Sequence, residues 1–185
     1  MKIKAFINWK NYNKDGKLIS EHEHEANSFV KQFAQFLINR LFDSVAINFN
    51  DVTNTLRSYG AGSGIVDAPS GNNNYGIVVG TGTNAVTISN YALQTKIATG
   101  TGAGELSYGA CTVDSDVTID GSTAYFQIYR TFTNSSGAGI TIQEIGIIKM
   151  ITGTSYYFLL ERSLSENTIA DAASATLTYK ISITV

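Results

Sequence analysis

From about residue 76 onward, the sequence is a series of short β-prone runs separated by glycine-containing turn signals, and this pattern restricts the fold most. The last run is the clearest, because apolar and polar residues alternate strictly from Thr176 to Val185. Such alternation places one side of a strand on a core and the other on solvent or a neighbour. Strands are predicted at about 76–80, 85–89, 106–113, 123–133, 140–150, 155–162 and 175–185. We therefore predict a mainly β protein, an antiparallel β-sandwich of the Ig-like or jelly-roll-like kind.

The composition excludes several classes of protein. Charged residues make up 15% of the 185 residues and the formal net charge is −2, so we expect no broad basic surface for nucleic acid. A single cysteine, Cys111, permits no disulfide framework. No apolar run reaches the roughly 18 residues of a membrane-spanning helix, and Met1–Lys4 leads into a polar segment rather than a signal-peptide core. A chain folded in a reducing cytoplasm fits these observations.

The first 58 residues differ from the rest of the chain. Residues 1–50 carry seven Lys/Arg against five Asp/Glu, whereas residues 51–185 carry six against ten, and all 20 threonines lie after residue 52. The turn signal Asp15-Gly16 predicts a hairpin, and Ser20-x-x-Glu23 resembles a capping box that starts a helix over about 22–42. We expect a docking module over residues 1–58 whose helix packs on another subunit or on the β domain through Phe29, Phe33, Phe36 and Leu37.

Glycines and three consecutive asparagines mark residues 59–75 as a linker, which leaves residues 76–185 as the sandwich domain. Within that domain, residues 134–139 contain turn-forming residues between two β-rich runs. A hairpin there would place Arg130 opposite Glu144 on a face that also carries Phe132 and Ile142. A charge on such a face is costly unless it is paired. One reading is a buried ion pair that fixes the register or an interface, and the other is a half-exposed face at the sheet edge.

These same residues carry a resemblance to a known class of proteins. The run from Arg130 to Gly137, followed by Ile140 to Ile147 with its Glu-Ile-Gly, resembles a hairpin of structural proteins of tailed bacteriophages. The segments 80–93, 158–162 and 177–185 are similar too, so the resemblance covers roughly residues 75–185, and residues 27–33 resemble the leading helix of such proteins. The resemblance implies a component of the tail, neck or capsid surface of a virion.

Motifs that could carry chemistry lack the context that they need. Gly80-x-Gly82-x-x-Ala85 follows an apolar run but precedes β-prone residues, whereas a dinucleotide site needs a helix there. His22 and His24 diverge if they lie on a helix, and they share a face only if residues 21–25 form a strand. The spacing of Asp114, Asp116 and Asp120 does not match a calcium loop. We predict no catalytic, cofactor-binding or metal-binding residues.

These observations leave three functional classes. The first is a virion structural protein that forms homo-oligomers and docks onto other virion proteins, without binding a membrane or a specific nucleic acid. The second, the alternative, is a receptor- or glycan-binding module at a tail tip or fibre, which several strand tyrosines would suit. The third is a polysaccharide-cleaving enzyme, which needs two carboxylates in a cleft.

Overall fold

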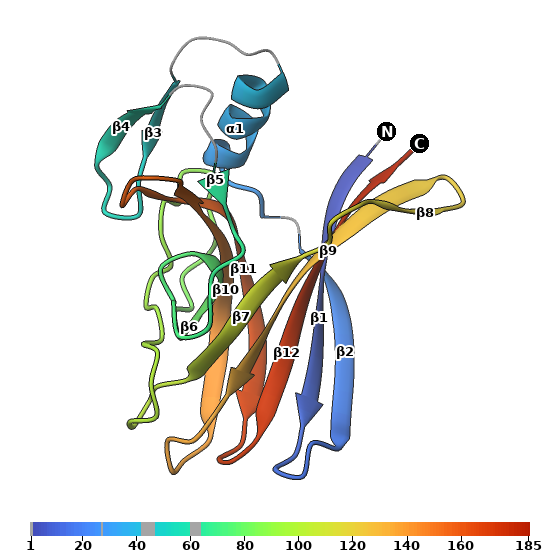
Figure 1. The fold of residues 1–185 in the computed structure, drawn as a ribbon, viewed down its shortest axis with the longest axis vertical. Coiled ribbons are helices and arrows are strands. Elements are labelled where there is room, and N and C mark those ends of the chain that lie inside the picture. Colours follow the sequence, from blue (N-terminus) through green and yellow to red (C-terminus); the bar gives the residue numbers. More distant parts are fainter. Residues whose placement is uncertain (1, 27, 42–46, 60–63) are drawn as a thin grey trace.

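The structure is a computed structural model that describes residues 2–26, 28–41, 47–59 and 64–185. Within them, the strands form two larger antiparallel sheets that enclose the main core, and a two-stranded sheet lies beside one helix, α1 (Lys31–Leu41) (Figure 1). The predicted mainly β fold, an antiparallel β-sandwich, is confirmed. No helix of the described part is long and apolar enough to cross a membrane.

Sheet A has the strand order β2-β1-β12-β9-β7, with β8 also paired to β9. Its strands are β1 (Lys2–Tyr12), β2 (Leu18–Ala26), β7 (Ser107–Val113), β8 (Thr118–Asp120), β9 (Thr123–Thr133) and β12 (Ser174–Thr184). Sheet B has the order β11-β10-β5, with β6 also paired to β10. Its strands are β5 (Gly64–Ile65), β6 (Gly76–Gly80), β10 (Ile140–Ile151) and β11 (Tyr157–Ile169), and the small sheet pairs β3 (Ile47–Asn50) with β4 (Leu56–Tyr59).

The N-terminal hairpin is part of the sandwich. β1 pairs with β2 on one side and with β12 on the other, from Lys2 opposite Thr184 to Tyr12 opposite Ser174. Its alternate side chains Ala5, Ile7 and Trp9 are fully buried in the core. The expected boundary at residue 58 therefore does not separate a docking module from the sandwich, because the hairpin supplies two strands of sheet A.

The helix begins later than predicted. Residues 18–26 form β2, so Ser20 and Glu23 are strand residues and the predicted capping box is wrong. The segment alternates Glu and His with a period of two, and two of its glutamates meet lysines across the strand pair, at 2.8 Å for Lys4–Glu25 and 3.5 Å for Lys10–Glu21. Such cross-strand pairs favour the strand over an acidic helix start. α1 then starts at Lys31.

The predicted linker is largely packed. Residues 60–63 lie outside the described residues, but β5 pairs with β10 at Met150 and Ile151, and Ala68 and Tyr75 are buried in the core. The backbone amide of Cys111 donates a hydrogen bond to the carbonyl of Ala68. Residues 64–75 are thus an irregular layer of the sandwich rather than a free connection.

The predicted hairpin between β9 and β10 is wrong. β9 belongs to sheet A, where it pairs with β12 and β7, and β10 belongs to sheet B, where it pairs with β11 and β6. The connection crosses between the sheets around Asn134, which is fully buried and donates to the carbonyls of Ala138 and Ile169. The residues Asn-Ser-Ser-Gly favour a tight turn both in a hairpin within one sheet and in a connection between two sheets. They therefore do not indicate whether the chain stays in one sheet.

A line of polar side chains runs along the inner face of β11 and meets sheet A. The Oγ of Ser165 accepts a hydrogen bond from Nε1 of Trp9 at 2.9 Å, and Asn167 exchanges two side-chain hydrogen bonds with Asn11. The carboxyl group of Glu161 is hydrogen-bonded to Tyr179 and to Ser163. A shift of one residue in the strand register would leave these buried groups without hydrogen-bond partners. They therefore fix how the two sheets face each other.

Trp9→Ala tests whether the hairpin belongs to the cooperative unit. The substitution removes a fully buried indole and leaves Ser165 without its donor, so we expect a loss of about 3–5 kcal/mol in the free energy of unfolding. Urea denaturation should show a single transition at lower midpoint, and Lys10→Ala, on the opposite face of β1, should change little. A second transition, with the sandwich unfolding at its wild-type midpoint, would contradict this expectation.

Glu161 gives the stability a distinct pH dependence. Burial raises the pKa of this carboxyl group to about 8, although its hydrogen bonds and Arg162 partly oppose the rise, whereas the ordinary value is 4.5. The folded chain therefore keeps a proton that the unfolded chain releases, so the contribution of Glu161 to stability is full below pH 4.5 and declines as the pH rises to about 8.

We expect Glu161→Gln to gain stability relative to the wild type as the pH rises across this window, by at most about 1.4 kcal/mol per pH unit. Urea unfolding at several pH values measures the difference. Glu166→Gln, at an exposed position of the same strand, is the matched control. Parallel pH profiles for the wild type and Glu161→Gln would show that the carboxyl group is not buried with its proton.

Candidate docking site

The helix and the segment before it bring the four predicted interface residues to different environments. Phe29 packs against the main core, and its ring stacks on that of Phe33 with the ring centroids 4.0 Å apart. Phe36 is buried in a second, smaller core with Phe49 and Phe158. Leu37 is exposed. Thus Phe29 and Phe36 lie against the β-sandwich and Leu37 is open to a partner.

α1 presents an exposed apolar stripe. Leu37 and Leu41 follow Phe33 by four and eight residues, so the three side chains lie on one side of the helix. Leu41 is 71% exposed, and the neighbouring Ile38 is also exposed. An apolar stripe that continues from a half-buried Phe33 into solvent is typical of a helix that packs on a further surface.

Sheet A supplies a second apolar wall where it diverges from sheet B. Figure 1 shows β8, the start of β9 and both chain termini on one side, with α1 across from them. Ile3 lies opposite Ile183, Ile183 opposite Ala124, and Ala124 opposite Ile119. Direct cross-strand partners share a face, so these four residues form one apolar row on the inner side of the sheet. Ile119 is 78% exposed, and we call this row the overhang.

An apolar cleft of about 220 Å³ is lined by residues of α1, of the segment before it and of both larger sheets, and we call it the docking cleft. It is lined by Phe29, Phe33, Gly64, Val66, Val113, Phe126, Ile128, Ile147, Lys149, Leu160 and Ile181. Phe126 and Ile181 lie two residues along their strands from the overhang, so the cleft and the overhang are one continuous apolar surface.

Lys149 is the one charged residue among the described residues that line the docking cleft. Its Nζ lies 4.4 Å from the centroid of the Phe36 ring. Burial, and next Arg40, lower the pKa of this amine. Within the part of the chain that the structure describes, the cation is held against an aromatic face rather than by a carboxylate, which keeps the cleft predominantly apolar.

Arg130 and Glu144 do not pair with each other, so that prediction is wrong, although both side chains are fully buried. Arg130 donates instead to five described backbone carbonyls, those of Pro69, Asn72, Tyr75, Ile77 and Gly109. Burial lowers the pKa of the guanidinium. The two residues lie on strands of different sheets. The prediction failed because period-two alternation indicates which face of a strand a residue occupies but not which sheet the strand joins.

Glu144 holds a loop over the outer face of sheet B. Its carboxylate pairs with Nε of Arg162 at 2.8 Å and accepts hydrogen bonds from the backbone amides of Gly82, Gln94 and Thr95. The loop of residues 81–96 thereby covers Glu144 and Arg162, whose side chains are 0% and 2% exposed. The buried ion pair that the sequence indicated exists, with a different arginine.

Sequence reasoning missed Arg162, although the sequence contains a signal for it. Glu161 and Arg162 are adjacent charged residues that lie between the apolar run Tyr157–Leu160 and the apolar residue Leu164. Adjacent strand residues point to opposite faces, so an apolar strand with both charges buried must be covered on both faces. Glu161 faces the core and Arg162 faces the 81–96 loop.

The other motifs form no recognisable centre within the described residues. His22 and His24 share a face of β2, with ring centroids 6.4 Å apart, but no group of three or more His, Cys, Asp or Glu there is placed to hold a metal ion. No helix follows Gly82, and Asp114 accepts a hydrogen bond from the amide of Gln127. Burial raises the pKa of the Cys111 thiol, which makes it a poor nucleophile.

Comparisons of the chain with models of protein families, with curated proteins and with solved structures found no match. Among the described residues, the apolar surface that joins the docking cleft to the overhang has the exposed apolar character typical of an interaction site.

A double-mutant cycle tests the reassigned ion pair. Glu144→Gln and Arg162→Gln each leave a buried charge unpaired, so each should lower the free energy of unfolding by about 3–5 kcal/mol, and the double variant should lose clearly less than the sum. The exposed pair Lys4–Glu25 is the control, with a coupling of about 1 kcal/mol or less. Additive losses for Glu144 and Arg162 in urea denaturation would contradict the assignment.

Proposed function

We propose that this chain is a structural protein of a tailed-bacteriophage virion. It is made in the host cytoplasm and enters the tail, the neck or the capsid surface by docking onto copies of itself and onto other virion proteins. The observation that carries the proposal is the exposed apolar surface formed by the docking cleft and the overhang. The resemblance of residues 130–137 and 140–147 and their flanking segments to phage structural proteins supports the virion setting.

The energetics of this surface favour association. Burial of apolar surface stabilises a complex by roughly 25 cal/mol per Å² before the costs of association are subtracted. The exposed side chains gather on two surfaces, the Leu37–Leu41 stripe of α1 and the Ile3–Ile119 row of the overhang. Single exposed apolar residues are ordinary in soluble proteins, whereas a continuous apolar surface of this kind marks an interaction site.

The occupant of the docking cleft in this proposal is the overhang of a second copy. Within the described residues, no second layer covers the apolar face of the overhang, and the docking cleft beside it is apolar too. Two copies related by a two-fold axis would each insert an overhang into the other's cleft, which is the self-complementary arrangement of most homodimers. The formal net charge of −2 per chain causes little repulsion between copies.

Ile119→Asp tests the association. Ile119 is exposed, so the substitution should leave the unfolding midpoint nearly unchanged while it places a charge in the buried interface. We expect sedimentation velocity to show an oligomer for the wild type and a 19.9 kDa monomer for the variant. Ile19→Asp, at an exposed position near the opposite end of sheet A, should assemble like the wild type. A monomeric wild type, or an Ile119→Asp variant that still assembles, would contradict the proposed occupant.

The virion setting has a separate test. Particles purified from cells infected with the virus that encodes the chain should contain it at a fixed stoichiometry, and a map of those particles should show the sandwich next to other virion proteins. A chain found only in the low-mass fraction of the lysate would contradict a structural role, whatever its oligomeric state.

A further inference from the structure

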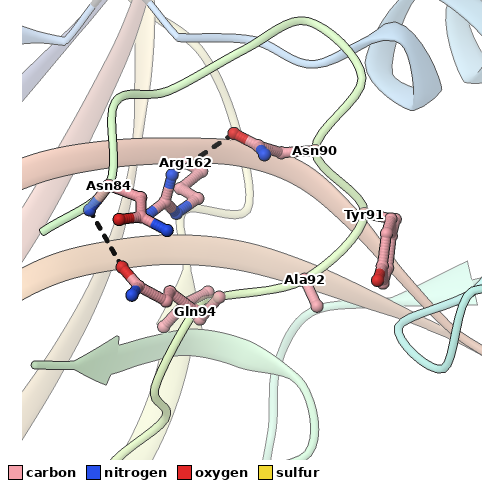
Figure 2. Close-up of a pocket in the computed structure, with 7 residues that line it drawn as sticks. Asn84, Asn90, Tyr91, Ala92, Gln94 and Arg162 are labelled. Atoms are coloured by element: carbon pink, nitrogen blue, oxygen red, sulfur yellow. Dashed lines mark hydrogen bonds between the residues drawn. The ribbon is translucent and has the colours of Figure 1, made fainter. Parts of the chain in front are cut away.

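The 81–96 loop forms a polar pocket on the outer face of sheet B, on β10 and β11 rather than on the overhang. The pocket has a volume of about 270 Å³ and is lined by Asn84, Asn90, Tyr91, Ala92, Leu93, Gln94 and Arg162. Figure 2 shows the Arg162 guanidinium within the curve of the loop, with Asn84 and Gln94 on one side and Asn90 on the other. The volume is at the small end for small-molecule sites, which suits a single ring.

The loop is held in shape before any ligand binds. The side-chain oxygen of Gln94 accepts hydrogen bonds from the amides of Thr83 and Asn84, both at 2.9 Å. The side-chain oxygen of Asn90 accepts from the amide of Thr87 at 2.8 Å and from Nη1 of Arg162 at 3.3 Å. Glu144 anchors the base of the loop through three backbone amides. A fixed loop loses little conformational entropy when it takes up a ligand.

Arg162 is incompletely satisfied. Its Nε bonds to Glu144 and its Nη1 to Asn90, but its Nη2 is buried and has no hydrogen-bond partner among the described residues. A buried donor without a partner is energetically costly, and more so when it belongs to a charged group. The guanidinium therefore supplies one donor that a ligand oxygen can satisfy.

The rest of the wall determines the class of ligand. The charge of Arg162 is already paired with Glu144, and the other lining residues are uncharged, so a charged ligand would find no counter-ion. The amide groups of Asn84, Asn90 and Gln94 both donate and accept hydrogen bonds, as hydroxyl groups do. The half-exposed ring of Tyr91 offers an apolar face for the C–H side of a sugar ring.

We propose that this pocket binds a neutral saccharide unit, with Nη2 of Arg162 donating to a ring or hydroxyl oxygen and Tyr91 packing on the ring. Because Nη2 lies beneath the pocket surface, a side chain of the loop turns aside to admit the oxygen. The side chain of Asn84 makes no hydrogen bond within the described residues, so its amide group can bond to a hydroxyl group of the saccharide. The site is independent of the docking cleft, and its failure would leave the proposed assembly untouched.

Titration of the ¹⁵N-labelled full chain tests the proposal. The probes are the methyl glycosides of glucose, galactose, mannose and N-acetylglucosamine, with glucuronic acid and N-acetylneuraminic acid for comparison. We expect at least one neutral glycoside to shift the amide signals of Gly82, Thr83 and Gln94 in a saturable way. No saturable shift with any neutral glycoside would overturn the proposal. Saturable binding of the acidic sugars alone would also overturn the proposal, because it rests on the absence of an unpaired positive charge in the pocket wall.

Three variants connect the binding to the pocket. Tyr91→Ala and Asn84→Ala alter exposed side chains and should weaken binding by about tenfold or more, whereas Tyr129→Ala, an exposed tyrosine on β9, should not change it. Arg162→Lys keeps a cation beside Glu144 but removes Nη2, so it should abolish binding if thermal unfolding shows it folded. If it does not fold, Tyr91→Ala and Asn84→Ala decide the outcome. Unchanged affinity in both alanine variants would refute the site.

Discussion

The arrangement of the two sheets depends on how the protein interior solvates Arg130. This fully buried guanidinium has no carboxylate partner within 4 Å among the described residues, and backbone carbonyls from Pro69 to Ile77 and at Gly109 take the place of water. Each carbonyl that accepts from a charged donor gains a strong hydrogen bond. The segment before β6 must therefore wrap around a side chain of β9, which ties an irregular layer and sheet B to sheet A.

The sequence was sufficient to predict the position of strands whose apolar and polar residues alternate strictly. It was insufficient to predict which strands pair with one another. The run from Thr176 to Val185 was predicted as a strand over 175–185 and is β12 over Ser174–Thr184. Residues 20–25 were misread because Ser20 and Glu23 have the spacing of a capping box, while the alternating glutamates and histidines have the period of a strand. Arg130 and Glu144 were correctly placed on buried faces, but their partners depend on which sheet each strand joins.

The candidate docking site shows the same limit. Helical spacing was enough to place Phe33, Phe36 and Leu37 on one helix, since it depends on residues close in sequence, but Phe29 lies before the helix in a bridge to Glu161. The overhang was not foreseeable, because its row joins Ile3, Ile183, Ala124 and Ile119 through three strand registers that link distant parts of the chain. The loop pocket could not be predicted for a related reason. The glycines at the start of the loop resemble a nucleotide-binding motif, and the pocket's charged group, Arg162, comes from a distant strand.

The pairing of β1 with β12 has a consequence for how the protein is made. The register joins residues 2–12 to residues 174–184, so an inner strand pair of sheet A closes almost the whole chain into one loop. Closing such a loop is entropically costly and comes late, which slows folding in proteins rich in non-local contacts. During synthesis β1 and β2 would form at most an isolated hairpin until β12 is made. The side chain of Trp9 would remain accessible to solvent or chaperones during that time.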